Sequence, residues 1–166
     1  MVPAAERLAV REGVTGEDRM LLLTAAWFHD VGFTEQVADH ELIGIRIASE
    51  VLPGFGYTPE QIQVISGIIL ATRLPQTPHT LLEAILVDAD LDVLGREDYV
   101  VRHQELRQEM AVVNGTPHTD KEWYLVQQDF LSNHHYFTEA ARALRDAGKA
   151  RNLALVLARL AELSDS

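Results

Sequence analysis

The chain has 166 residues, of which 47% are hydrophobic, and it carries a formal net charge of −11 at pH 7. These values predict one ordinary globular domain over residues 1–166 and exclude wholesale disorder. No apolar run approaches the roughly 20 residues that a membrane span requires. The sequence contains no cysteine, which excludes disulfides, thiolate metal sites and cysteine nucleophiles.

The negative charge bounds the partners that we expect. Tracking along a nucleic-acid backbone requires clustered lysine and arginine, so nucleic acid is not an expected partner. The charge does not exclude a small phosphorylated substrate, because a bound divalent cation can reverse the electrostatic field inside one pocket. Residues 1–9 lack the basic and apolar segments of a signal peptide, so we expect cytoplasmic residence and no membrane partner.

Helix-capping and helix-breaking residues divide residues 1–95 into predicted helices. Thr58, Pro59 and Gln61 form a near-ideal helix start with a capping box. Thr80 is predicted to cap the helix that Gly95 closes. We expect helices at residues 3–12, 15–30, 38–52, 58–73 and 80–94.

The rest of the chain has the same helical character. We expect helices at residues 98–113, 121–134, 138–147 and 149–163, with a break at residues 114–117. The last of these helices carries an apolar stripe that packs on the domain or, alternatively, forms the seam of a homodimer. The stripe comprises Leu153, Val156, Leu157, Leu160 and Leu163. The predicted fold class is all-α.

The residues best suited to chemistry end the apolar helical stretch LLLTAAWFHDVG, residues 21–32. Helical spacing places His29 on one face with Leu22 and Ala25, and Asp30 on one face with Ala26, so both side chains are expected to point toward the core. A buried carboxylate without compensation is costly. A metal ion held between this pair and a distant acid would compensate it.

The distant acid is expected in VDADLDVLG, residues 87–95. Helical spacing turns Asp90 inward, and Asp88 could support the site or replace Asp90 as a ligand. Asp92 is expected to be solvated. The alternatives without a metal are a histidine that caps a helix end at His29 and a surface acid at Asp90.

These two segments resemble a known family. AAWFHDVG, residues 25–32, looks like the signature of the HD superfamily of metal-dependent phosphohydrolases, and DADLDVLG, residues 88–95, resembles its terminal aspartate motif. His40 followed by Gly44 and the stretch IILATR, residues 68–73, extend the resemblance. It covers about residues 1–95 as metal-site helices and leaves about residues 96–166 as a helical extension. The resemblance implies an HD-domain-like bundle of about seven to nine helices.

The resemblance also implies a site and an activity. His29, Asp30 and Asp90 match the ligands of a divalent ion, for which manganese, iron, magnesium, cobalt and zinc suit the donor set. Asp30 and Asp90 would also orient the attacking water, which makes them the candidate catalytic residues. The candidate substrate-binding residues are His40, Arg73 and His79, although each of the three also fits an ordinary role at a helix end or in a loop.

The implied function is hydrolysis of a phosphomonoester or phosphodiester, of a nucleotide or another small metabolite. The chain departs from the family pattern at one point: that pattern has a further histidine one helix upstream, and no histidine precedes His29. Either an extended N-terminus supplies that ligand, or the site has three ligands. The alternative function is a degenerate HD domain that serves as a regulatory or protein-interaction module without catalysis.

Overall fold

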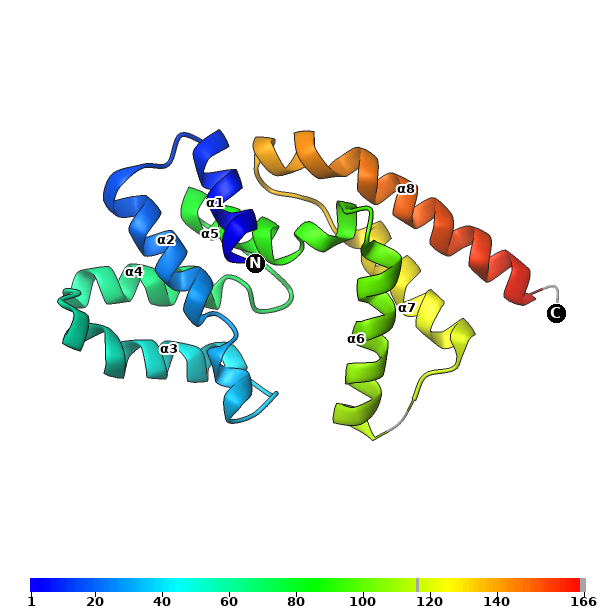
Figure 1. The fold of residues 1–166 in the computed structure, drawn as a ribbon, viewed down its shortest axis with the longest axis horizontal. Coiled ribbons are helices and arrows are strands. Elements are labelled where there is room, and N and C mark those ends of the chain that lie inside the picture. Colours follow the sequence, from blue (N-terminus) through cyan, green and yellow to red (C-terminus); the bar gives the residue numbers. More distant parts are fainter. Residues whose placement is uncertain (116, 165–166) are drawn as a thin grey trace. The chain divides into compact units, whose positions relative to one another are not determined.

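The computed structural model describes residues 1–115 and 117–164, apart from the side chain of Asn114. The described residues form eight α-helices and three short 3-10 helices, without a strand, so the predicted all-α class is confirmed (Figure 1). Backbone contacts divide the chain into two compact units. The N-terminal unit comprises residues 1–91 and 137–141, and the C-terminal unit comprises residues 92–136 and those from 142 onward. No helix in the described ranges has the length and hydropathy to cross a membrane.

The N-terminal unit packs five α-helices around an aliphatic core (Figure 1). Helix α1 contacts α2 and α5, while α4 contacts α2, α3 and α5. The α-helices are α1 (Val2–Arg11), α2 (Gly16–Phe28), α3 (His40–Val51), α4 (Pro59–Leu70) and α5 (Leu81–Asp90). The 3-10 helices η1 (Val31–Thr34) and η2 (Leu52–Phe55) follow α2 and α3. The largest fully buried aliphatic side chains of this unit are Leu8, Leu22, Ile65, Ile68, Ile69, Ile85, Leu86 and Val87.

Local capping interactions fix where two of these helices begin. The Thr58 hydroxyl accepts the Gln61 N–H at 3.3 Å, and Gln61 Oε1 accepts the Thr58 N–H at 2.9 Å, which confirms the predicted capping box of α4. Thr80 caps α5 by accepting the Glu83 N–H at 3.3 Å. The helix ends agree less well with the sequence prediction. Helix α5 ends at Asp90, and a 3-10 helix replaces its expected last turn.

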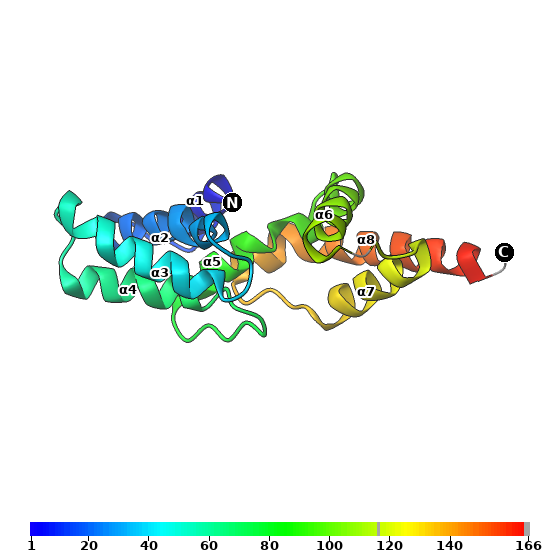
Figure 2. The same cartoon turned by 90° about the horizontal axis from the view of Figure 1, so that it is seen from below.

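The C-terminal unit contains η3 (Asp92–Gly95), α6 (Tyr99–Asn114), α7 (Asp120–Asn133) and most of α8 (Glu139–Ser164) (Figure 2). A buried polar network joins α6 to α7: the indole N–H of Trp123 donates to His103 Nδ1 at 3.0 Å, and the Tyr99 hydroxyl donates to Gln127 at 3.2 Å. Thr116, within the expected break after α6, lies outside the described residues.

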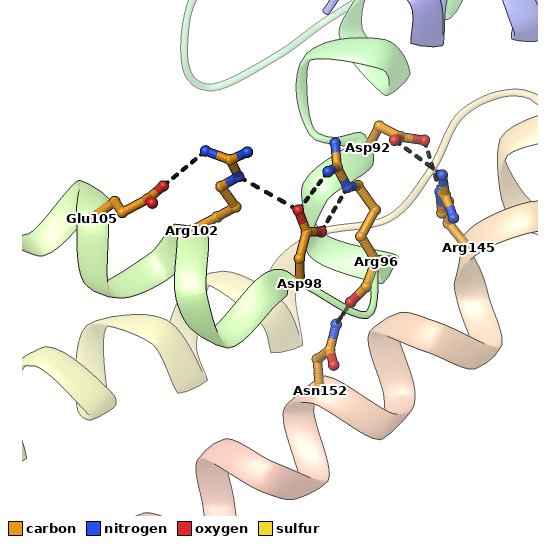
Figure 3. A network of polar contacts seen from close by, with 7 residues as sticks. All are labelled: Asp92, Arg96, Asp98, Arg102, Glu105, Arg145 and Asn152. Carbon is orange, nitrogen blue, oxygen red and sulfur yellow. Dashed lines mark hydrogen bonds and ion pairs between the residues drawn. The ribbon is translucent and has the colours of Figure 1, made fainter.

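Polar contacts tie η3 to α8 (Figure 3). Arg145 on α8 donates to both carboxylate oxygens of Asp92, at 2.7 and 3.1 Å. The Asn152 amide donates to the carbonyl oxygens of Leu94 and Arg96, at 2.8 and 2.9 Å. The prediction that Asp92 is solvated is therefore wrong, since only 6% of its side chain is exposed. Its burial is compensated by a bidentate ion pair.

Helix α8 runs without interruption through Gly148, so the prediction of two separate helices at residues 138–147 and 149–163 is wrong. A Cβ atom on Gly148 would lie 2.0 Å from the carbonyl oxygen of Gly95, and one on Gly95 would lie 2.5 Å from that of Arg145. Both glycines therefore permit close packing of η3 against α8. In the predicted stripe of the same helix, Val156 and Leu160 are buried.

We expect the substitution Gly148→Ala to destabilise the protein by about 2 kcal/mol or more, because the added methyl group overlaps the backbone of Gly95. An alanine within a helix is ordinarily more favourable than glycine by about 1 kcal/mol. The matched control is Gly67→Ala in α4, where the nearest atom, Glu83 Oε1, is 3.6 Å from the added Cβ. Urea denaturation of both variants checks the prediction, and equal stabilisation of both would contradict it.

The buried neutral imidazole of His103 predicts a loss of stability in acid. Burial, with a smaller contribution from Arg107, lowers its pKa to about 4 from an ordinary value of 6.5. Between these pH values the unfolded chain binds a proton at His103 that the folded protein does not bind, so stability is complete above pH 6.5 and falls toward pH 4. We expect this position to contribute about 3 kcal/mol of that loss.

The measurement is urea denaturation followed by Trp123 fluorescence at several pH values, with the exposed Trp27 replaced by phenylalanine. The matched comparison is the same protein with His103→Gln, which retains an acceptor for the Trp123 indole but does not titrate. The pH dependence of the difference in unfolding free energy isolates His103. A difference that stays constant from pH 6.5 to pH 4 would show that the ring is not held neutral.

Candidate metal centre

His29 is the buried imidazole at the end of α2, with 5% of the residue exposed. Its backbone N–H still donates to the Ala25 carbonyl at 2.9 Å, so the last helical turn fixes its position. Its Nδ1 lies 3.0 Å from the Ala26 carbonyl oxygen, which can only accept, so Nδ1 carries a proton. In the neutral ring Nε2 is then the free electron-pair donor.

The three predicted ligands meet at this Nε2 atom. It lies 2.9 Å from Asp30 Oδ2 and 3.6 Å from Asp90 Oδ1, and it is buried without a hydrogen bond of acceptable geometry. Asp30 directly follows His29, whereas Asp90 is the last residue of α5. The contact of α2 with α5 therefore joins two distant parts of the sequence at one imidazole.

The two carboxylates determine the charge of His29. Burial lowers the pKa of the imidazole, but Asp30 and Asp90 outweigh that effect and raise the pKa to about 9 from 6.5. Without another cation, the ring is therefore protonated at neutral pH and forms ion pairs with both acids. The arrangement requires a positive charge between these three side chains, which a proton or a metal ion can supply.

Asp30 does not point into the core, so that part of the sequence prediction is wrong. Helix α2 ends at Phe28, and Asp30 lies between it and η1, which begins at Val31. The Asp30 side chain is 55% exposed and that of Asp90 is 30% exposed, against 7% for His29. The inward prediction is correct for His29, while solvent reaches both acids.

His40 brings a second imidazole to the other oxygen of Asp30. Its Nδ1 lies 3.1 Å from the Val37 carbonyl, and its Nε2 lies 3.8 Å from Asp30 Oδ1. The ring stacks on Phe33 with a centroid distance of 3.8 Å, which limits its rotation. Both histidines therefore donate through Nδ1 to a carbonyl three residues earlier and direct Nε2 toward Asp30.

Glu41 belongs to the same cluster, and the sequence analysis missed it. Its carboxylate oxygen lies 3.5 Å from His40 Nε2, although only 7% of the residue is exposed. A buried acid in the first turn of α3 is unexpected from the sequence, because glutamate usually occupies exposed positions. The one available signal was its direct adjacency to His40.

Gly32 and Gly44 allow the end of α2 to lie against the start of α3. A Cβ atom on Gly32 would lie 1.9 Å from the His40 carbonyl oxygen, and one on Gly44 would lie 2.8 Å from that of Phe28. Neither distance leaves room for a side chain. Glycine is therefore required at both positions, because only glycine permits the close approach that places His40 beside Asp30.

The remaining predicted residues lie at different distances from the cluster. Arg73 forms an ion pair with Asp39, the residue before His40, so it lies near the start of α3. His79 precedes α5, and its N–H donates to Glu83 at 2.6 Å. Asp90 is at the opposite end of that helix, whose ten residues span about 15 Å. The structure thus brings His40 to the predicted ligands and leaves His79 apart.

Asp88, considered as an alternative ligand, is occupied elsewhere. It is fully buried, and its oxygens accept hydrogen bonds from Phe137 and Thr138 rather than facing His29. Among the described residues, no three His, Asp or Glu side chains are already arranged to hold a metal ion. Binding at His29, Asp30 and Asp90 would require the proton to leave His29 and the two carboxylates to reorient.

We expect Asp90→Asn to lower the pKa of His29 below its value of about 9 in the metal-free protein, because one of the two stabilising carboxylates becomes neutral. The measurement is an NMR titration of the His29 imidazole in the presence of a chelator. The matched control is Asp18→Asn, which makes the same charge change in the first turn of α2, about 16 Å from His29 along the helix. Equal shifts in the two variants would show that Asp90 is not beside the ring.

Comparisons with protein-family models, with curated proteins and with solved structures gave no match to this chain. The chemistry assigned to the site therefore rests on the residues and distances above, and the resemblance to the HD superfamily stays a prediction.

Proposed function

We propose that the chain is a metal-dependent phosphohydrolase that cleaves a phosphomonoester or phosphodiester of a nucleotide or a similar small metabolite. The observation that carries this proposal is the buried Nε2 atom of His29, which faces the carboxylates of Asp30 and Asp90 without a hydrogen bond of acceptable geometry. In the neutral ring this nitrogen is an electron-pair donor, and such a donor beside two anionic oxygens suits a divalent cation.

The donor set fits such an ion. His29, Asp30 and Asp90 would hold it, and the Nδ1 hydrogen bond to Ala26 is the usual way in which a protein orients a metal-binding imidazole. One nitrogen and carboxylate oxygens suit manganese, iron, magnesium, cobalt or zinc. When bound, the ion would polarise a phosphoryl oxygen and lower the pKa of a bound water.

The chain's own residues would do the rest of the work. Asp30 and Asp90 are partly exposed, so their free oxygens can accept hydrogen bonds from the attacking water and orient it. His40 presents an imidazole beside Asp30 with 20% of its side chain exposed, where it can contact a substrate oxygen. Arg73 forms an ion pair with Asp39 and so provides a cationic side chain beside the start of α3.

Electrostatics supports the dependence on a metal. The cluster combines the carboxylates of Asp30, Asp90 and Glu41 with two imidazoles, and the guanidinium of Arg73 is already paired with Asp39. A phosphate group would be repelled by these acids unless a bound cation reversed the local field. Metal binding and substrate binding are therefore expected to be linked.

One observation favours a second candidate, a non-catalytic regulatory or protein-interaction module. With a pKa of about 9, the His29 imidazolium itself neutralises Asp30 and Asp90 at pH 7. In that case the cluster is a structural ion-pair network between α2 and α5, and such networks also perturb pKa values without catalysis. Metal content separates the two candidates.

We expect protein purified without chelator or an affinity-tag metal to contain close to one divalent ion per chain by mass spectrometry. His29→Ala and Asp90→Asn should lose it, because the first removes the imidazole ligand and the second removes the negative charge of a carboxylate ligand. His79→Ala is the matched control and should keep the ion, since His79 lies at the other end of α5. Hydrolysis of bis(p-nitrophenyl) phosphate and of a nucleotide panel should follow the metal content. If no metal binds after manganese or iron is supplied, the module is the better description.

A further inference from the structure

The end of α5 is held by Phe137 and Thr138, which directly precede α8. Asp88 is fully buried, and its carboxylate accepts three hydrogen bonds: from the Phe137 N–H at 2.8 Å, the Thr138 N–H at 2.7 Å and the Thr138 hydroxyl at 2.7 Å. Charge-assisted hydrogen bonds of this length are among the strong ones, and in an apolar interior they compensate the burial of the carboxylate.

A second contact fixes the same turn. The Ala140 N–H donates at 2.7 Å to Oε1 of Glu12, the residue directly after α1. The Thr138 hydroxyl also accepts the Ala141 N–H at 3.2 Å, so it caps α8 while it donates to Asp88. These contacts explain why residues 137–141 belong to the N-terminal unit, whereas the rest of α8 belongs to the other.

This attachment bears directly on Asp90. Asp90 is the last residue of α5, and Leu91 after it has left helical geometry, with φ −97° and ψ 16°. The end of a helix frays easily because its last carbonyl groups lack partners within the helix. Residues two apart on a helix point about 200° apart, so Asp88 can face α8 while Asp90 faces His29. Asp88 thus anchors the turn that presents Asp90.

We propose that Thr138, acting through Asp88, is a positioning residue that holds Asp90 beside His29. The first turn of α8 is then part of the support of the metal centre, although it lies far from the ligands in the sequence. This inference rests on the proposed function for its metal, but the anchoring of α5 can be measured without one.

The first test compares Thr138→Val with Thr119→Val in the full chain. Thr119 caps α7 and accepts the Glu122 N–H at 3.3 Å, as Thr138 accepts an N–H at the start of α8, but Thr119 does not contact Asp88. We expect Mn²⁺ affinity, measured by titration calorimetry, to fall about tenfold or more in Thr138→Val, as for other residues that orient metal ligands. Thr119→Val and the conservative Thr138→Ser should bind Mn²⁺ like the parent.

The second test measures hydrogen exchange in the metal-free proteins. The Leu91 N–H donates to the Val87 carbonyl at 3.3 Å and reports on the last turn of α5. We expect the amides of residues 89–91 to exchange faster in Thr138→Val than in Thr119→Val, while amides in the middle of α4 keep their parent rates. Local opening of this kind is distinct from a loss of global stability.

The outcomes separate the two proposals. If the parent does not bind Mn²⁺, the proposed function fails, and the exchange rates alone decide whether Thr138 anchors the end of α5. If both the affinity and the exchange rates of Thr138→Val match those of Thr119→Val, the positioning role is overturned. Should Thr138→Val fail to fold, Glu12→Ala replaces it with the same expectations, because it removes the other contact of the same turn.

Discussion

The N-terminal unit depends on one polar contact beside an apolar core, the imidazole of His29 facing the carboxylates of Asp30 and Asp90. A nitrogen between two acids requires a positive charge. A proton on His29 supplies that charge when no other cation is bound. Burial alone would lower the pKa of the ring, but the two carboxylates outweigh that effect. The same atoms can serve a divalent cation. The contact that joins α2 to α5 and the proposed metal site therefore involve the same atoms, and either a proton or a metal ion can balance the two carboxylates.

Backbone contact between the end of α2 and the start of α3 brings a second imidazole, that of His40, to the same cluster. Gly32 and Gly44 leave no space for a side chain, so the end of α2 and the start of α3 approach within backbone contact. That approach directs His40 toward the second oxygen of Asp30. Gly95 and Gly148 have the same function in the C-terminal unit, where η3 lies against α8. In both units, glycines act as packing surfaces.

The three aspartates between residues 88 and 92 have three separate partners. Asp88 binds the start of α8, Asp90 faces His29, and Asp92 forms the ion pair with Arg145. Their spacing of two residues on a helix, followed by a change to 3-10 geometry, turns successive carboxylates in different directions. Spacing alone cannot assign such partners, because all three come from segments that lie far away in the sequence.

Features that depend on neighbouring residues could be predicted from the sequence alone. The all-α class and the capping box of α4 follow from periodicity and from side chains three residues apart, and the same signals indicated that His29 points inward. Tertiary structure decided the rest. It exposed Asp30 by ending α2 early, buried Glu41 beside His40, and carried α8 through Gly148. The course of α8 shows the reason: Gly148 packs against Gly95, which is distant in sequence, and the space offered by that partner outweighs the local preference of glycine to end a helix.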